Sequence, residues 1–191
     1  INSIHEKLQF GKSIQRKITI IEGWSKNDLL KKLSIVFPNK KLKLENIPEN
    51  IIANTYFYEV TDNPEKILTN IVKISNIKSQ EIWNSRNKDV PLKNISEMFT
   101  LASIVEKESG IKAEKPIISA VFFNRLKKKM KLQSDPTVVY AITKGKKKME
   151  RKLLRKDLKF KSKFNTYLNT GLPPYPICLP GLESLKAVAN P

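Results

Sequence analysis

The sequence predicts an α+β fold in which a mainly helical lobe carries a few short strands. Three observations lead to this class. Capping residues repeatedly precede segments in which apolar residues recur every three or four positions. Two runs, 17–21 and 51–60, have the β-branched or aromatic content and the length of strands. The proline-rich stretch 165–180 must be a non-helical loop, and it precedes a last helical segment.

The first half of the chain is expected to contain both strands and two helices. Ser25, with Asp28 three residues later, forms the pattern of a capping box at a helix start. Pro64 suits the first turn of a longer helix. The expected elements are, in order, a strand at 17–21, a turn at 22–23, a helix at 26–33, a strand at 51–60 and a helix from 64 toward 83.

The second half is expected to be mainly helical, with three intervening segments of other kinds. Asn94 and Glu97 form a second capping-box pattern, so a helix should begin near Ile95 and end before Gly110. Asp135 is placed to be the N-cap of a later helix, with Pro136 following it. The remaining expectations are a helix at 115–126, an extended segment at 130–133, a basic polar segment at 144–163, the loop at 165–180 and, after Gly181, a last helix to about Ala189.

The helix that begins at Ile95 carries an acid on its apolar side. At about 100° per residue, Glu106 falls within the arc of apolar side chains, and Glu108 lies about 160° away from it. A carboxylate that faces apolar surface is costly unless it is neutral, paired or beside a cleft. A carboxyl that stays protonated near neutral pH suits a general acid. Glu106 is therefore a candidate acid, with a plain surface carboxylate as the alternative, whereas Glu108 is expected to be a solvated partner of a lysine.

A second set of polar residues lies beside the Gly- and Pro-rich part of the chain. Gln133, Asn165, Tyr167 and Asn169 offer groups that could hydrogen-bond the hydroxyls and acetamides of a sugar. The alternative is turn chemistry, in which Asn side chains bond their own backbone. For Asp135 the N-cap role comes first, with substrate contact as the second interpretation.

Composition limits the classes of function. The chain has 191 residues, a formal net charge of +18, one cysteine and one histidine, so an internal disulfide, a cysteine-based metal site and a histidine-dependent triad are excluded. No apolar run reaches the length of a membrane span. Phosphate-binding Gly-rich loops, zinc-ligand spacings and nucleophile elbows are absent, so neither a cofactor nor a metal is expected. The positive charge fits an anionic partner or a compositional bias, and no nucleic-acid-reading motif accompanies it.

Several segments, taken in order, resemble the endolytic murein transglycosylases of the YceG-like family. The match is specific because the segments occur in the same order along most of the chain. The segments are Ile18–Ser25, Asn54–Tyr56, Leu101–Glu108, Val121–Leu126, Leu132–Tyr140, Asn165–Tyr167, Gly171–Pro174 and Pro180–Ala187. Departures from the family pattern are Asn50, Ala53 and Asn54 where Gly, Pro and Asp are usual, together with Tyr175 and Leu179 in the loop.

The resemblance implies cleavage of peptidoglycan between N-acetylmuramic acid and N-acetylglucosamine, without water, to leave 1,6-anhydromuramyl ends. The family's catalytic glutamate would fall on Glu106, which would protonate the glycosidic oxygen and then accept the proton of the muramoyl C6 hydroxyl. Residues that would position the glycan are Gln133, Asp135, Asn165, Tyr167 and Asn169. A non-catalytic peptidoglycan-binding or scaffolding remnant is the alternative, and a basic nucleic-acid-binding protein is a remote one.

The resemblance also implies how the chain is organised and where it acts. Residues 1–16 would be the tail of a small LysM-like subdomain, and 17–191 the catalytic domain, which ends before the family's C-terminal segment. A membrane anchor would lie outside this chain, with the catalytic domain facing the periplasm or the cell exterior. Expected partners are peptidoglycan glycan strands and the machinery of peptidoglycan synthesis.

Overall fold

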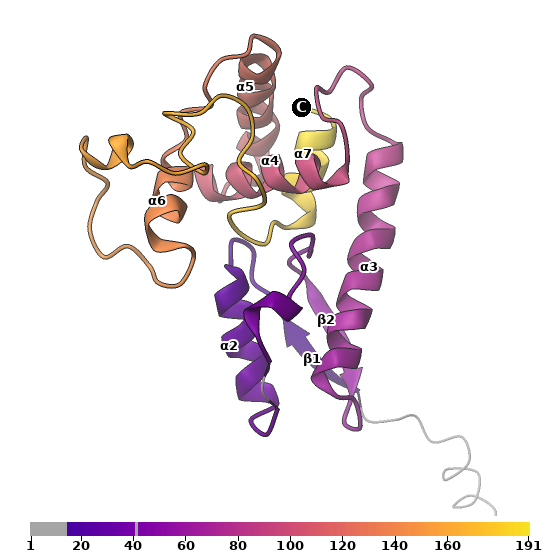
Figure 1. Cartoon of the computed structure of the whole chain (residues 1–191). Helices are drawn as coiled ribbons and strands as arrows, with labels where there is room; N and C mark the ends of the chain where they lie inside the picture. The colour runs from indigo at the N-terminus through magenta and orange to yellow at the C-terminus, as the bar shows by residue number, and fades with distance from the viewer. Residues whose placement is uncertain (1–14, 41) are drawn as a thin grey trace, which may run out of the picture.

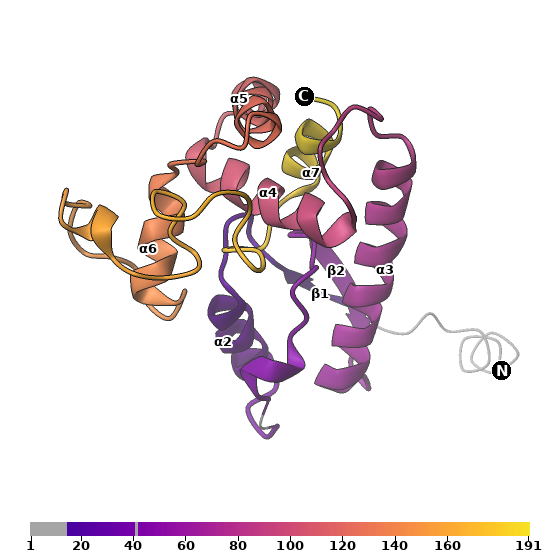
Figure 2. The ribbon, with the colours of Figure 1, turned by 45° about the horizontal axis from the view of Figure 1, so that its top comes forward.

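The computed structural model describes residues 15–40 and 42–191, and it confirms the expected α+β class. A lower lobe contains the two strands and the first helix, and an upper lobe contains the later helices (Figure 1). One long helix, α3, runs along both lobes (Figure 2). The lower-lobe elements are β1 (Gln15–Thr19), α2 (Lys26–Val36), η1 (Leu44–Asn46) and β2 (Thr55–Glu59), followed by α3 (Pro64–Asn84). The upper-lobe elements are α4 (Ile95–Glu108), η2 (Lys112–Glu114), α5 (Lys115–Lys127), α6 (Asp135–Thr143), η3 (Asp157–Lys159) and α7 (Leu182–Ala189).

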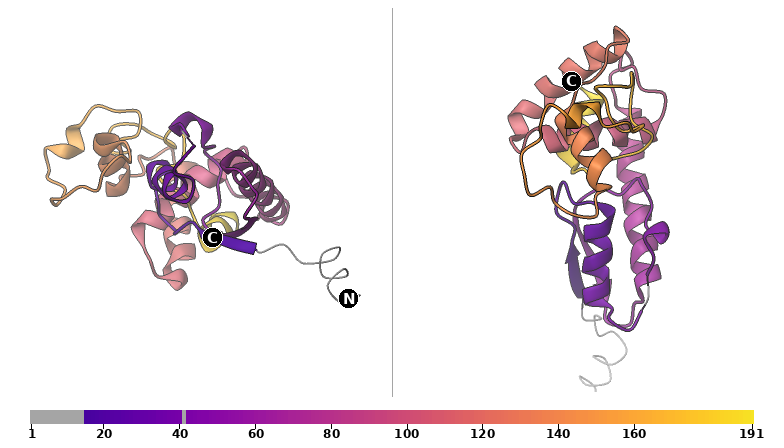
Figure 3. Two further views of the ribbon diagram at one scale, coloured as in Figure 1. Left: turned by 90° about the horizontal axis from the view of Figure 1, so that it is seen from below. Right: turned by 60° about the vertical axis from the view of Figure 1, so that its left-hand side comes forward.

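The lower lobe is built on a two-stranded antiparallel sheet. β1 pairs with β2 so that Ile18 lies opposite Tyr56. Both side chains are buried against Leu29 and Leu33 of α2 and Ile71 of α3. The two helices therefore enclose the sheet's apolar side chains in a core of their own, below the upper lobe (Figure 3).

The upper lobe is arranged around α4. All residues from Met98 to Val105 are buried, so α4 is enclosed on every side rather than along a single apolar arc. Its N-terminus follows the sequence pattern in part. The Asn94 side chain accepts a hydrogen bond from the Glu97 N–H at 2.9 Å, but the Glu97 carboxylate accepts from the Lys93 N–H, not from Asn94.

The proline-rich loop joins the two lobes, and its predicted non-helical, ordered character is confirmed. Leu179 exchanges backbone hydrogen bonds with the turn before α2: its N–H donates to Trp24 O at 2.7 Å, and its carbonyl accepts from Gly23 N at 3.0 Å. The Ile177 N–H donates to Ser103 Oγ of α4 at 2.9 Å. Burial raises the pKa of the nearby Cys178 thiol, so this cysteine is an inert packing residue.

The sequence predicted the helices better than the strands. β1 begins two residues earlier than expected, and β2 covers only the second half of 51–60. The expected N-cap role of Asp135 is wrong, because Ser134 precedes α6 and the Asp135 carboxylate is used elsewhere. Most of the expected LysM-like tail, residues 1–14, lies outside the described residues. No helix in the described part of the chain is long and apolar enough to cross a bilayer.

Candidate functional site

The C-terminal turn of α4 carries two carboxylates with different surroundings. The Glu106 side chain is 5% exposed, and its Oε1 accepts from Nζ of Lys115, itself 2% exposed, at 2.9 Å. Its Oε2 accepts from the Gly181 N–H at 2.9 Å and from Ser184 Oγ at 2.6 Å. Both oxygens are therefore engaged by groups on α5 and at the start of α7.

These contacts give Glu106 a clear structural role. Lys115 begins α5 and is almost completely enclosed, so its ammonium group requires a partner with opposite charge. Through one carboxylate, α4 is connected to α5 by an ion pair and to α7 by two hydrogen bonds. The helical wheel correctly placed Glu106 on an enclosed side, but what surrounds it is a set of three donors and not apolar surface.

Glu108 occupies the other side of the helix end. Glu108 is exposed, and its Oε1 accepts a hydrogen bond from Ser134 Oγ at 2.5 Å. Ser134 is buried and held in place, because its own N–H donates to Thr166 Oγ1 at 3.0 Å. Among residues 15–40 and 42–191, Glu108 has no ion pair with a lysine, so the partner expected from sequence is replaced by a fixed hydroxyl.

Two of the predicted glycan-contacting residues pair with each other beside Glu108. The Tyr167 hydroxyl donates to Asp135 Oδ1 at 2.7 Å. Burial, followed by this hydrogen bond and the negative charges of Asp135 and Glu108, raises the pKa of Tyr167 to about 12, while the Arg125 charge opposes the shift. Tyr167 therefore remains a neutral donor, and the side chains of Ser134, Asp135 and Tyr167 lie together near Glu108 at the end of α4.

Gln133 completes this group from the segment before α6. Its backbone is in the left-handed region, with φ of 51°, which is unusual for a residue with a Cβ. Its N–H donates to the Thr166 carbonyl at 3.1 Å, while its side chain is exposed. The reversal at Gln133 turns the chain so that Ser134 and Asp135 reach Glu108 and Tyr167.

The two asparagines of the predicted set are used by the loop itself. The side chain of the fully buried Asn165 donates to the carbonyls of Leu158 and Phe160 at 2.9 and 2.8 Å, and accepts from the Tyr167 N–H. Asn169 Nδ2 donates to the carbonyls of Ser162 and Asn165. The alternative of turn chemistry accounts for both. Of the six predicted site residues, the structure brings Asp135 and Tyr167 into contact and places Gln133 next to them in the chain, before Ser134.

Ser134 and Arg125 belong to the site but were not singled out from sequence. Ser134 directly precedes α6, but its hydroxyl binds Glu108 and does not cap that helix. Arg125 NH1 donates to the Leu132 carbonyl, which fixes the segment that carries Gln133. In the described part of the chain, no cluster of three or more His, Cys, Asp or Glu residues is arranged to hold a metal ion.

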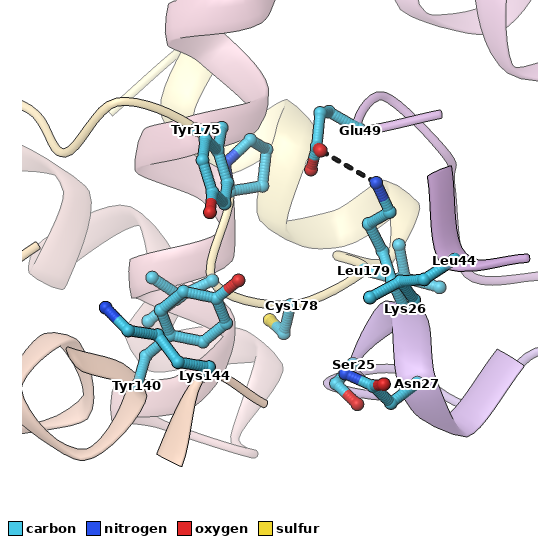
Figure 4. A pocket seen from close by; sticks show the side chains of 12 residues that line it. Ser25, Lys26, Asn27, Leu44, Glu49, Tyr140, Lys144, Tyr175, Cys178 and Leu179 are labelled. Atoms are coloured by element: carbon cyan, nitrogen blue, oxygen red, sulfur yellow. Dashed lines mark hydrogen bonds and ion pairs between the residues drawn. The ribbon is translucent and has the colours of Figure 1, made fainter. Parts of the chain in front are cut away.

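Two hollows lie between α6 and the start of α2. A groove of about 610 Å³ runs between the start of α2 and α6, and Lys107 and Pro136, the neighbours of Glu108 and Asp135, line it. A smaller cavity of about 80 Å³ has Tyr140 and Tyr175 on one side and the Lys26–Glu49 ion pair on the other (Figure 4). The smaller one has room for only a few water molecules. Of these two hollows, only the groove has room for part of a larger ligand.

The known proteins that this chain resembles carry two descriptions, YceG-like and endolytic murein transglycosylase. The family model described as the YceG-like family matches residues 1–191. The endolytic murein transglycosylase of Bacillus subtilis is 41% identical over 133 residues, covering 68% of this chain and 36% of that protein. The one of Streptococcus pneumoniae strain R6 is 28% identical over 163 residues, covering 85% of this chain and 29% of that protein.

The crystal structure of a yceG-like protein from Listeria monocytogenes superposes with a TM-score of 0.74 at 28% identity, over 100% of this chain and 71% of that one. The chain spans about a third of the length of the two transglycosylases from Bacillus subtilis and Streptococcus pneumoniae.

Proposed function

This chain belongs to the YceG-like family, and from that premise we propose that it cleaves the glycan strands of peptidoglycan as an endolytic transglycosylase. The proposal is supported by two relatives, from Bacillus subtilis and Streptococcus pneumoniae, that are both named endolytic murein transglycosylase. The bond cleaved would join N-acetylmuramic acid to N-acetylglucosamine, and the product would carry a 1,6-anhydromuramyl end.

Glu108 is the carboxyl that we assign to proton transfer. The observation that carries this assignment is its exposure beside Ser134, with Asp135, Tyr167 and Gln133 around it. A catalytic acid must reach the substrate oxygen to within hydrogen-bonding distance. Glu106, which the helical wheel favours, has both oxygens engaged inside the lobe, so it is the alternative that the experiment below separates.

One carboxyl is sufficient for the proposed chemistry. Protonated Glu108 donates its proton to the glycosidic oxygen as the bond from that oxygen to muramoyl C1 breaks. The resulting carboxylate then accepts the proton of the muramoyl C6 hydroxyl, whose oxygen forms the new bond to C1. No water is consumed, in contrast to glycoside hydrolysis, which uses a second carboxyl to activate water or to attack the sugar.

The neighbouring groups have supporting roles in this proposal. Ser134 Oγ orients the Glu108 carboxyl, and Thr166 orients Ser134. The Asp135–Tyr167 pair and the Gln133 side chain offer acceptors and donors for sugar hydroxyl and acetamide groups. A transition state held by groups that are already oriented needs little reorganisation when the bond breaks.

Digestion of purified sacculi, followed by mass analysis of the products, tests the proposal with a matched pair of variants. Glu108→Gln and Glu106→Gln each replace one carboxyl of α4 by an amide. We expect Glu108→Gln to lower the yield of anhydromuramyl ends by a factor of about a hundred or more while the protein stays folded. A folded Glu106→Gln variant should keep cleaving.

Other outcomes have definite meanings. Loss of cleavage in a folded Glu106→Gln protein, with Glu108→Gln active, would transfer the role to Glu106. Ordinary reducing ends in place of anhydro ends would contradict the transglycosylase reaction. Binding to sacculi without any soluble product from the wild-type protein would favour a non-catalytic peptidoglycan-binding module.

Domain organisation and location form part of the same proposal. Residues 17–191 would belong to the catalytic domain, acting outside the cytoplasmic membrane, with any anchor outside this chain. The names of the relatives, which give murein as what they act on, support this location. Accessibility of the domain to a protease added outside intact spheroplasts would test this orientation. Cross-linking in cells would test whether the machinery of peptidoglycan synthesis is its partner.

A further inference from the structure

The groove next to the proposed site is lined by an excess of positive charge. Its lysines are Lys31 on α2, Lys107 on α4 and the run Lys146–Lys148 after α6. Within residues 15–40 and 42–191, none of these five forms an ion pair. Lys107 Nζ donates to the Gly23 carbonyl at 3.3 Å, a neutral partner that leaves its charge uncompensated. The five charges therefore attract an anionic ligand, and the net charge of the chain adds to the attraction.

The groove also contains two acids, and both have other partners or contacts. Asp28 closes the N-terminus of α2, where its carboxylate accepts from the Ser25 N–H at 2.9 Å and from Ser25 Oγ at 2.7 Å. Glu22 packs against Gly181 so closely that a Cβ on that glycine would lie 1.9 Å from Glu22 Oε1. Neither acid is paired with a lysine of the groove.

The lysine run is held in position by the fold. α6 ends in two successive left-handed residues, Lys144 with φ of 54° and Gly145 with φ of 66°. A Cβ on Gly145 would lie 3.1 Å from Ser25 Cβ, so the turn packs directly on the start of α2. The Gly145 carbonyl also accepts from Asn27 Nδ2 at 3.2 Å. Lys146–Lys148 therefore begin at a fixed point on the wall of the groove.

The position and charge of the groove together indicate the ligand class. Its lining includes Lys107 on α4 and Pro136 on α6, each one residue from a member of the proposed site, so the groove lies within reach of a strand bound at Glu108. Muramoyl residues of peptidoglycan carry peptide stems with free carboxylates, and lysine ammonium groups pair with carboxylates. Trp24 adds an apolar surface in the same groove.

We propose that this lysine-lined groove binds the carboxylates of the peptide stems, so that the protein prefers glycan strands that still carry their peptides. This inference rests on the proposed function and adds a specificity determinant to it. The contacts are exposed ion pairs, so each contributes little and the preference depends on several acting together. Binding should therefore weaken as ionic strength rises.

The test compares two soluble ligands in the Glu108→Gln protein. One is glycan with its peptides, released from sacculi by an endopeptidase, and the other is the same glycan denuded by an amidase. The groove variant is Lys146→Gln/Lys147→Gln/Lys148→Gln. The matched control is Lys127→Gln/Lys128→Gln/Lys129→Gln, which removes the same charge from the exposed end of α5, outside the groove.

Calorimetric titration should show that the groove variant binds peptide-bearing glycan about fivefold more weakly than the parent protein. Its affinity for denuded glycan should be unchanged, and the control should match the parent on both ligands. An equal loss on both ligands, or an equal loss in the control, would overturn the inference. A competition experiment adds a further check. The inference would also be overturned if teichoic acid, a phosphodiester polymer, displaced the peptide-bearing strand more effectively than a free peptide stem does.

Cleavage by the wild-type protein separates this inference from the proposed function. Cleavage of both glycans at equal rates, with no effect of the lysine changes, leaves the function intact and rejects the preference. Peptide-dependent binding without cleavage of either glycan rejects the function and leaves the groove as a binding site.

Discussion

The carboxylates of Glu106 and Glu108 belong to residues only two positions apart, yet they contact different parts of the molecule. Glu106 pairs with the buried Lys115, and Glu108 accepts from Ser134 at the surface. Because residues i and i+2 point to different sides of a helix, one carboxyl can stabilise the lobe while the other is free to meet substrate. The end of α4 thus combines a structural acid and a candidate catalytic acid in three residues.

Removing the partner of Glu106 should destabilise the protein severely. Lys115→Met leaves an enclosed carboxylate without its cation, and the free energy of unfolding should fall by about 3–5 kcal/mol. Adding Glu106→Gln should recover much of this loss, because the double variant has no uncompensated buried charge. Urea denaturation of the single and double variants measures both effects. The control is Lys112→Met, at an exposed position just before α5. Equal stability of Lys115→Met and Lys112→Met would contradict the prediction.

Asp135 should keep the Tyr167 phenol protonated at high pH. Burial is the largest cause of the rise in the pKa of Tyr167 to about 12, followed by the hydrogen bond to Asp135 and the Asp135 charge. Asp135→Asn should therefore lower this pKa while leaving it above the ordinary value of 10.0. Because the folded-state pKa is raised, the associated stability is complete below pH 10 and is lost as the pH rises toward 12.

Ultraviolet absorbance titration measures this change, and subtracting the Tyr167→Phe curve isolates the residue. An unchanged Tyr167 transition in Asp135→Asn would show that burial alone sets the pKa.

The basic segment after α6 should be resistant to acid. Both Asp157 oxygens accept from the Arg151 guanidinium, at 2.6 and 2.9 Å, and this pair lowers the pKa of Asp157 to about 2 from 3.8. A lowered folded-state pKa gives stability that is present above the unfolded value and is lost as pH falls through the folded one. The segment should stay ordered down to about pH 3 and loosen as the pH falls through about 2.

The carboxyl chemical shift of Asp157, followed by NMR, gives the midpoint directly. Arg151→Gln should move that midpoint up toward 3.8. Arg155→Gln, which removes an exposed charge from the same segment, should leave it nearly in place.

Gln133→Gly should separate backbone strain from substrate contact. A residue with a Cβ in the left-handed region costs about 1–2 kcal/mol, and glycine removes this strain. Glycine also gives the unfolded chain more conformational entropy to lose on folding, which offsets part of the gain. We expect the free energy of unfolding to rise by less than about 1 kcal/mol while sacculus cleavage falls. Lys129→Gly is the matched control, since Lys129 has φ of 52° and lies outside the proposed site. Equal cleavage by both glycine variants would remove Gln133 from the site.

Local sequence signals predicted the helices because their causes are local. Ser25 and Asp28 form the complete capping box of α2, and Asn94 caps α4 as expected. These bonds join residues three positions apart, so they can be inferred from a short window. The strands were less well bounded, because Ile51 and Ile52 have strand-like composition but are extended core residues before β2 begins.

The site depended on contacts that no local pattern contains. A helical wheel gives the direction of the Glu106 side chain, but the Gly181 and Ser184 donors are 75 and 78 positions away. Ser134 reaches Glu108 from 26 positions away. The same limit affected Asn165, whose amide satisfies the carbonyls of a segment that the sequence left without structure.

The loop that joins the lobes also affects how the molecule unfolds. Within four residues it is hydrogen-bonded to α4 through Ile177, to the turn before α2 through Leu179, and to Ala53 through the Pro180 carbonyl. Rotation of one lobe relative to the other would break these bonds together. The two hydrophobic cores therefore form one cooperative unit, and the distance between the walls of the groove is set when the chain folds, before any ligand arrives.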